Sequence, residues 1–211
     1  MTLEYWDDNG NNLSLLYDLF NSWDSVLHEY DKAWGNYIAP HMYIQQTQVG
    51  YLATAARDIG WLPQLEFSIE RRYTAGSYSN GRCDLALWRK KGKQVQELFV
   101  EVESCWYTVN INPKHVKEVS ALLSKAQDDV KCIREARGLP RIALVIIRLN
   151  KAPFSYDSSD LWERIKLIRK ELSANFCCLH VREDKYRKRT PTEEGRDCLG
   201  MAAIGCIKGV I

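Results

Sequence analysis

The chain has 211 residues, a formal net charge of +2 at pH 7, 45% hydrophobic residues and 27% charged residues. This length suits one domain, the composition is ordinary for a globular protein, and the small net charge is no sign of nucleic-acid binding by itself. No run approaches the roughly 20 apolar residues that span a bilayer, and the acidic N-terminus lacks the layout of a signal peptide, so no membrane partner is expected. The seven cysteines are scattered without a C-x-x-C pair, which favours buried free thiols and a cytoplasmic location.

Two helices are predicted in the N-terminal part of the chain. Leucines and aromatic residues recur at helical spacing over residues 12–29, beginning at Asn12, a residue type that caps helices. Residues 43–59 repeat the pattern after Pro40, although Gly50 interrupts it.

Three strands are predicted next. Residues 64–73 alternate between apolar side chains and polar or acidic ones, and residues 82–88 and 97–104 have strand composition. The segments 74–81 and 89–93 are rich in glycine and polar residues, which predicts turns. A hairpin followed by a third strand is the expected arrangement.

The second half alternates helices with strands. Helices are predicted over residues 115–137 and 159–172, and strands over 141–148 and 176–181. The strand at 141–148 is apolar on both faces, as a central strand covered on two sides would be. This alternation implies crossovers and at least one parallel pair in a mixed sheet, hence an α/β fold. The last 30 residues carry no clear pattern.

Acidic residues occur on two of the predicted strands. Strand periodicity places Glu101 and Glu103 on one face, about 7 Å apart at Cβ. Asp84 interrupts an apolar strand, where aspartate is disfavoured. If the two strands pair, Asp84 approaches Glu101, and such carboxylates repel one another unless a divalent cation neutralises them.

Oxygen-only ligation suits Mg²⁺ or Mn²⁺, and such a site supports phosphodiester hydrolysis. Glu103 could help to orient or deprotonate the attacking water. The alternatives are plain structural roles. Most Glu pairs at this spacing form a solvated face, and an aspartate in a short apolar strand more often marks a turn, a cap or an edge.

The layout resembles the PD-(D/E)xK nuclease superfamily, which includes many restriction endonucleases. That family's core is a helix, a three-stranded antiparallel unit, a helix and another strand, with acidic residues on the second and third strands. The resemblance covers roughly residues 43–150, and it makes Asp84 the motif aspartate and Glu101 the first residue of the E-x-K element. Cys83 stands where the family usually has proline, and Glu103 where it usually has lysine.

The resemblance implies a restriction-endonuclease-like mixed central sheet flanked by helices, with Asp84 and Glu101 as metal ligands. In some members the lysine migrates to a nearby element, and three lysines of the following helix could substitute for it: Lys114, Lys117 and Lys125. Glu70 is a second-tier candidate ligand on the polar face of the first strand. The alternative is a degenerate, inactive copy.

The expected function is that of a Mg²⁺-dependent (or Mn²⁺-dependent) deoxyribonuclease that hydrolyses DNA phosphodiester bonds, of the restriction type. The resemblance further implies DNA as partner and pairing as a homodimer, since cutting both strands usually needs two sites. The alternative function is a catalytically inactive nucleic-acid-binding or assembly module. The expected layout is a single domain over 1–211, with a helical extension over 1–42, the nuclease-like core over 43–181 and an unassigned basic segment over 182–211.

Other residues have weaker claims. The basic segments 89–93 and 185–189 are candidate phosphate contacts on either side of the carboxylates, although each reads equally well as a solvated loop. His115 could meet a phosphate at a helix start, but a solvated role is commoner. The remaining candidates for nucleic-acid contacts are favoured as ordinary surface or core residues: Gln45, Gln46, Gln48, Tyr73, Tyr78, Trp88, Trp106 and Tyr107.

Overall fold

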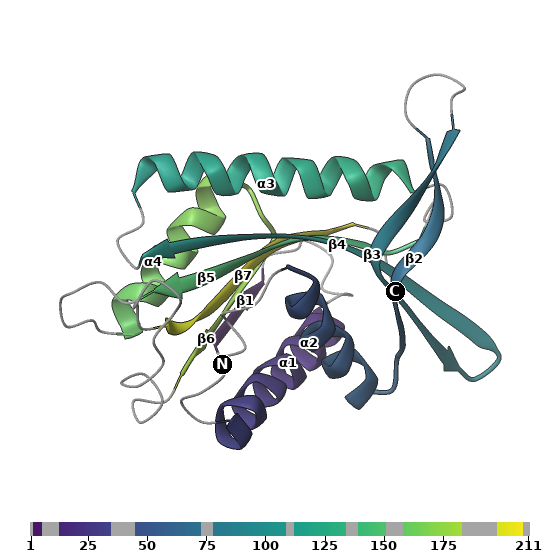
Figure 1. Ribbon diagram of the computed structural model, residues 1–211, viewed down its shortest axis with the longest axis horizontal. Coiled ribbons are helices and arrows are strands. Elements are labelled where there is room, and N and C mark those ends of the chain that lie inside the picture. The colour runs from purple at the N-terminus through teal and green to yellow at the C-terminus, as the bar shows by residue number, and fades with distance from the viewer. Residues whose placement is uncertain are drawn as a thin grey trace.

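One seven-stranded sheet forms the centre of the protein, in the order β1-β6-β7-β5-β4-β3-β2, with helices on both faces (Figure 1). The computed structural model describes residues 2–5, 13–34, 45–72, 78–108, 112–133, 139–150, 158–182 and 198–208. The helices are α1 (Leu13–Trp34), α2 (Gln45–Asp58), α3 (Pro113–Cys132) and α4 (Ser158–Glu171). The strands are β1 (Thr2–Tyr5), β2 (Leu62–Arg72), β3 (Tyr78–Lys91), β4 (Gln94–Thr108), β5 (Arg141–Asn150), β6 (Phe176–Val181) and β7 (Cys198–Lys208).

The sheet is mixed. Strands β4 and β5 pair in parallel and are joined by α3, while every other neighbouring pair is antiparallel. A parallel pair needs a crossover connection, and a helix is the usual one. The predicted mixed α/β sheet with a parallel pair is therefore confirmed.

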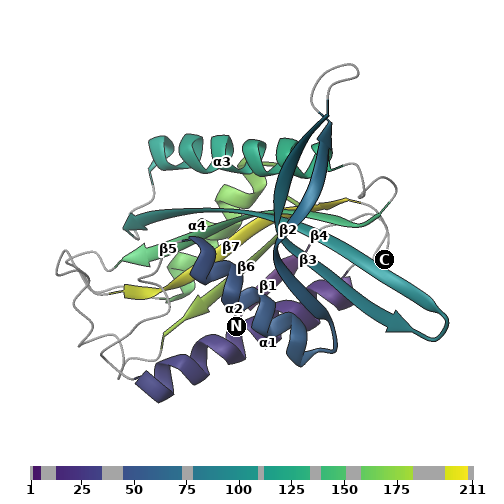
Figure 2. The ribbon, with the colours of Figure 1, turned by 45° about the vertical axis from the view of Figure 1, so that its right-hand side comes forward.

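The two faces of the sheet carry separate hydrophobic cores. Helices α1 and α2 pack on one face, and α3 and α4 pack on the other (Figures 1 and 2). Strand β5 lies between β7 and β4, and all of its residues after Arg141 are buried. This burial confirms that the run apolar on both faces is a central strand.

Sequence patterns missed two strands. The segment expected to be a helical extension contributes β1 to the sheet edge, and the unassigned C-terminal segment contributes β7 between β5 and β6. Glycines weaken the sequence signal of β7. Gly200 is nevertheless required by packing, because a Cβ there would lie 2.1 Å from the carbonyl oxygen of His180.

Several predicted boundaries were wrong. Helix α3 begins at Pro113 and ends at Cys132 rather than near residue 137, because Ile133 turns to an extended conformation and forms a β-bridge with Arg71. Residues 78–81, predicted as part of a turn, belong to β3 and pair with β2.

The predicted alternation along β2 also fails at one point. Glu66 has φ of 50°, in the left-handed region that non-glycine residues rarely adopt. On one side of it Leu65 pairs with Leu85, which packs with α1 and α2, and on the other side Phe67 pairs with Cys83, which packs below the end of α3. At Glu66 and Asp84, the side chains of the β2–β3 hairpin therefore switch from one face of the sheet to the other.

Two further properties of the described residues concern the cysteine side chains and the length of the helices. The six cysteines whose side chains are described are free thiols, and four of them are buried. Within the described ranges, no helix has the length and apolar character needed to cross a bilayer.

Candidate metal centre at a strand fork

Strands β3 and β4 separate in the middle of the sheet. Their ladder runs only from Lys91 opposite Gln94 to Leu85 opposite Val100. Beyond that point β3 continues to pair with β2, and β4 continues to pair with β5 (Figure 2). We call this point the strand fork and define it by Asp84, Glu101 and Val102.

The side chain of Asp84 replaces a main-chain partner at the strand fork. Its Oδ2 accepts a hydrogen bond of 2.8 Å from the backbone N–H of Val102. Its carboxyl group also lies within hydrogen-bonding distance of the carboxyl group of Glu101. Burial raises the pKa of Asp84, while the Val102 amide opposes that effect. An aspartate inside an apolar strand is thus explained by the local break in the ladder.

Glu101 is the most deeply buried acid of the group, with 4% of its surface exposed. Desolvation first, and the charge of Asp84 second, raise the pKa of Glu101 to about 8, against the opposing effect of Arg71. Because the two carboxyl groups are adjacent and buried, ionisation of one opposes ionisation of the other. Ionisation of both together is therefore disfavoured without a positive partner.

The predicted approach of Asp84 to Glu101 is present in the structure, and Glu103 lies two residues further along β4. Lys125 on α3 places its Nζ 2.5 Å from Oε1 of Glu103. Of the three lysines named from sequence, Lys125 is the one that reaches the acidic group. Lys114 and Lys117 are exposed nearer the start of α3.

Sequence reasoning missed Arg71 on β2. Its Nη2 lies 2.8 Å from Oε1 of Glu101, and its Nη1 lies 2.5 Å from Oδ1 of Asp129 on α3. Gly81 on the neighbouring strand makes room for it, since a Cβ there would lie 2.7 Å from Cδ and Nε of Arg71. A glycine inside a strand marks the close approach of another group, which is the signal that could have pointed to Arg71.

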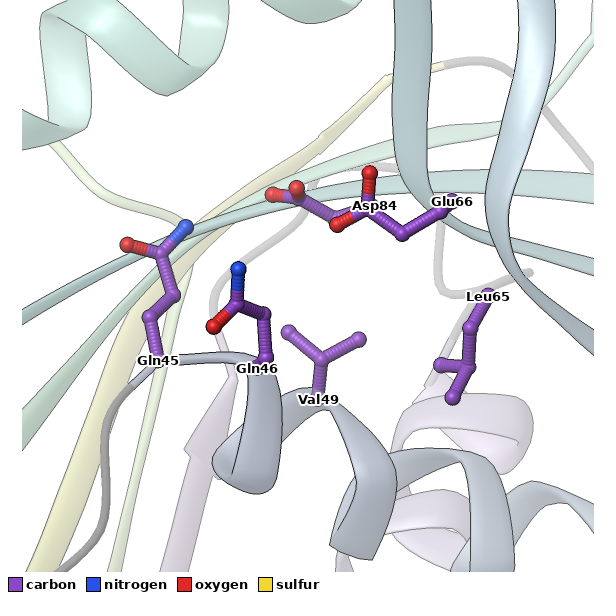
Figure 3. A pocket seen from close by; sticks show the side chains of 6 residues that line it. All are labelled: Gln45, Gln46, Val49, Leu65, Glu66 and Asp84. Atoms are coloured by element: carbon purple, nitrogen blue, oxygen red, sulfur yellow. The ribbon is translucent and has the colours of Figure 1, made fainter.

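A pocket of about 370 Å³ opens beside Asp84, between α2 and the β2–β3 hairpin. Figure 3 shows Gln45, Gln46 and Val49 extending from α2 toward Asp84 and Glu66 on the strands. The Nε2 of Gln45 donates to the carbonyl oxygen of Val102, which ties the start of α2 to the strand fork. Glu70, the second-tier candidate, pairs with Asn80 further along the hairpin and does not line this pocket.

The arrangement fits a small hard cation. Asp84 and Glu101 offer only oxygen atoms, and a bound cation would neutralise two carboxylates that burial keeps from ionising together. Their charge is not balanced by solvent, because Glu101 is buried and Asp84 is half-buried. The positive groups that balance the acidic side chains are Arg71 and Lys125.

The remaining predicted contacts have structural roles or lie elsewhere. His115 belongs to the capping box of α3 and stacks on Tyr107. Trp88 packs against Phe67, and Trp106 lies under the guanidinium of Arg148.

The basic turn at 89–93 was wrongly expected to flank the acids. Lys91 lies seven residues from Asp84 along β3, roughly 20 Å at the usual rise per residue. The basic segment 185–189, residue Tyr73 and the side chain of Tyr78 lie outside the described residues.

No family model matches the chain, and no curated protein matches it. The resemblance to the nuclease superfamily therefore rests on the residues and on the geometry of the strand fork.

Proposed function

We propose that the protein is a metal-dependent endonuclease that hydrolyses DNA phosphodiester bonds from a restriction-endonuclease-like fold. The observation that carries this proposal is the meeting of Asp84 and Glu101 at the strand fork, beside the Glu103–Lys125 pair. These side chains come from two strands and one helix. They lie close together although the like charges of the acids repel one another and burial disfavours their ionised forms.

The order of elements around the strand fork supports the same proposal. From α2 to β5 the chain runs through a helix, three antiparallel strands, a helix and a strand parallel to its neighbour. This is the order described above for the family core, with Asp84 on its second strand and Glu101 on its third. DNA as the substrate and a homodimeric assembly are implied by the same resemblance.

Asp84 and Glu101 would hold Mg²⁺ or Mn²⁺ through carboxylate oxygens. Such an ion supplies charge stabilisation at a phosphate oxygen and lowers the pKa of bound water. Glu103 accepts a hydrogen bond from Lys125, and this carboxylate and ammonium are the groups that would orient the attacking water and exchange protons with it. Lys125 thereby takes the place of the lysine that the E-x-K element lacks at residue 103.

A second candidate function, an inactive module that retains the fold, is favoured by Arg71. Its guanidinium lies 2.8 Å from Glu101, so the site already has a counter-charge beside the two carboxyl groups. A protein that used the strand fork only to hold its sheet together would need nothing more. In the enzyme, a divalent ion would bind beside the Arg71–Glu101 contact or displace it. In the inactive module, the contact would be sufficient without an ion.

The test is plasmid cleavage by the full chain in the presence of Mg²⁺ or Mn²⁺, with Asp84→Asn and Glu101→Gln variants beside it. Both substitutions keep the side-chain size and remove a charge. Cleavage by the wild type that both variants lose supports the enzyme. The matched control is Glu97→Gln, on the same strand as Glu101 but opposite Trp88 within the β3–β4 ladder, which should cut as the wild type does. No cleavage with retained DNA binding would support the inactive module.

A further inference from the structure

A second group of metal-ligand side chains lies far from the strand fork in the chain, between α1 and β6. Asp24 and His28 are one helical turn apart on α1, and His180 faces them from β6. One ligand atom from each lies within 4.8 Å of the others. We propose that these three residues bind a divalent transition-metal ion, independently of the carboxylate site.

The distances suit a single ion. Nδ1 of His180 lies 2.8 Å from Oδ1 of Asp24, and Nε2 of His28 lies 3.6 Å from Oδ2 of Asp24. Ligand bonds of about 2.0–2.1 Å place tetrahedral neighbours about 3.3–3.4 Å apart, and one ligand atom of each residue lies within 4.8 Å of the other two. The two imidazole rings are already adjacent, with centroids 4.7 Å apart at an angle of 64°. Binding of an ion would draw these ligand atoms closer together.

The donor set selects the metal class. Two imidazoles and one carboxylate suit Zn²⁺ and other first-row divalent ions, whereas Mg²⁺ prefers oxygen ligands. The nearby buried acid, Asp31, is paired with Arg182, which leaves Asp24 as the carboxylate of the group. Three protein ligands leave a coordination position open. The open coordination position would face the surface near His28, which is 29% exposed, because His180 is fully buried.

The position of the site indicates what the ion would do. Helix α1 supplies a large part of one hydrophobic core, and Trp23 on the same helix lies 6.4 Å from the ring of His180. An ion bound by α1 and β6 would fasten the first helix to the sheet across residues that are more than 150 positions apart in the chain. The competing reading is a hydrogen-bonded Asp–His cluster without an ion.

The test is Zn²⁺ and Co²⁺ binding by chelator-treated full-length protein, followed by calorimetry and by the visible absorption of Co²⁺. The variants are His28→Gln and Asp24→Asn, which alter partly exposed residues and preserve hydrogen-bonding groups, with Asp84→Asn included to remove the carboxylate site. Glu29→Gln, exposed on the same helix, is the matched control.

With the carboxylate site removed by Asp84→Asn, we expect one ion per chain, at least about tenfold weaker binding in each of the first two variants, and unchanged binding when Glu29→Gln is added. Zn²⁺ should also raise the melting temperature of the wild type and leave that of His28→Gln unchanged. Equal affinity in wild type and His28→Gln, or no Co²⁺ absorption in the wild type, would overturn the proposal. If His28→Gln does not fold, Asp24→Asn decides the outcome in the same way.

Discussion

Arg71 on β2 contacts three other elements, because its guanidinium lies 2.8 Å from Glu101 on β4, 2.5 Å from Asp129 on α3 and 2.6 Å from the carbonyl oxygen of Arg82 on β3. The side chains of Arg71 and Glu101 are only 12% and 5% exposed. In such surroundings the loss of one partner leaves an uncompensated buried charge, which is far more destabilising than the net contribution of the pair. The strand fork therefore depends on a residue that carries no recognisable motif.

Replacing Arg71 tests that dependence. Arg71→Met should lower the free energy of unfolding of the metal-free protein by about 3 kcal/mol, the lower end for a broken buried pair, because Asp129 stays partly exposed. Urea denaturation at a pH above about 8, where Glu101 is ionised, measures the change. Arg82→Met is the control, since Arg82 is 72% exposed and its contact with Glu66 is 3.7 Å long, and it should alter stability by less than about 1 kcal/mol. Equal effects of the two substitutions would contradict the structural role of Arg71.

Gly81 should matter only through Arg71. Gly81→Ala places a methyl group 2.7 Å from the Arg71 side chain and should destabilise the protein by about 1–3 kcal/mol, as overpacking does. In an Arg71→Ala background the same substitution should have little effect, because its obstacle is gone. The double-mutant cycle measures this coupling. A full effect of Gly81→Ala in both backgrounds would mean that Gly81 serves the backbone of β3 instead.

The stability of the metal-free protein should fall as the pH rises from about 4.5 to about 8. Glu101 has its pKa raised from 4.5 to about 8, so over this range the folded protein holds a proton that the unfolded chain has released. Unfolding curves in the presence of a chelator measure the trend. The Glu101→Gln protein should lose this contribution, and comparison with it cancels the effect of His180, whose pKa is lowered by burial. Identical pH profiles of the two proteins would show that Glu101 ionises normally.

Replacing Lys125 should affect catalysis much more than stability. Its side chain is 64% exposed, so the ion pair with Glu103 should contribute less than about 1 kcal/mol to folding. Under the proposed function, Lys125→Met should nevertheless reduce plasmid cleavage by about 10²-fold or more, as the loss of an acid–base group does. Lys117→Met, exposed earlier on the same helix, is the matched control and should retain activity. Wild-type cleavage rates in Lys125→Met would remove this residue from the proposed site.

Local patterns were enough to predict the elements that surround the strand fork. Hydrophobic periodicity placed helices near residues 43–59 and 115–137, and the order of strands brought Asp84 beside Glu101, because strand spacing of side chains is set by the chain itself. The boundaries differed where tertiary packing intervened. Helix α3 ends early because Ile133 forms a β-bridge with Arg71. The left-handed conformation of Glu66 moves the following side chains of β2 to the other face of the sheet.

Only the tertiary structure decided which residues meet across long distances. The choice of Lys125 over Lys114 and Lys117 depends on how α3 lies on the sheet, and no spacing in the sequence distinguishes the three. Arg71 reaches Glu101 from another strand, and His180 reaches Asp24 across most of the chain.

Such contacts follow from the way helices and strands pack together. A short stretch of sequence, which shows the hydrophobic period of one element, therefore does not reveal them. The elements were local properties of the sequence, and the chemical environment of each acid was a property of the whole fold.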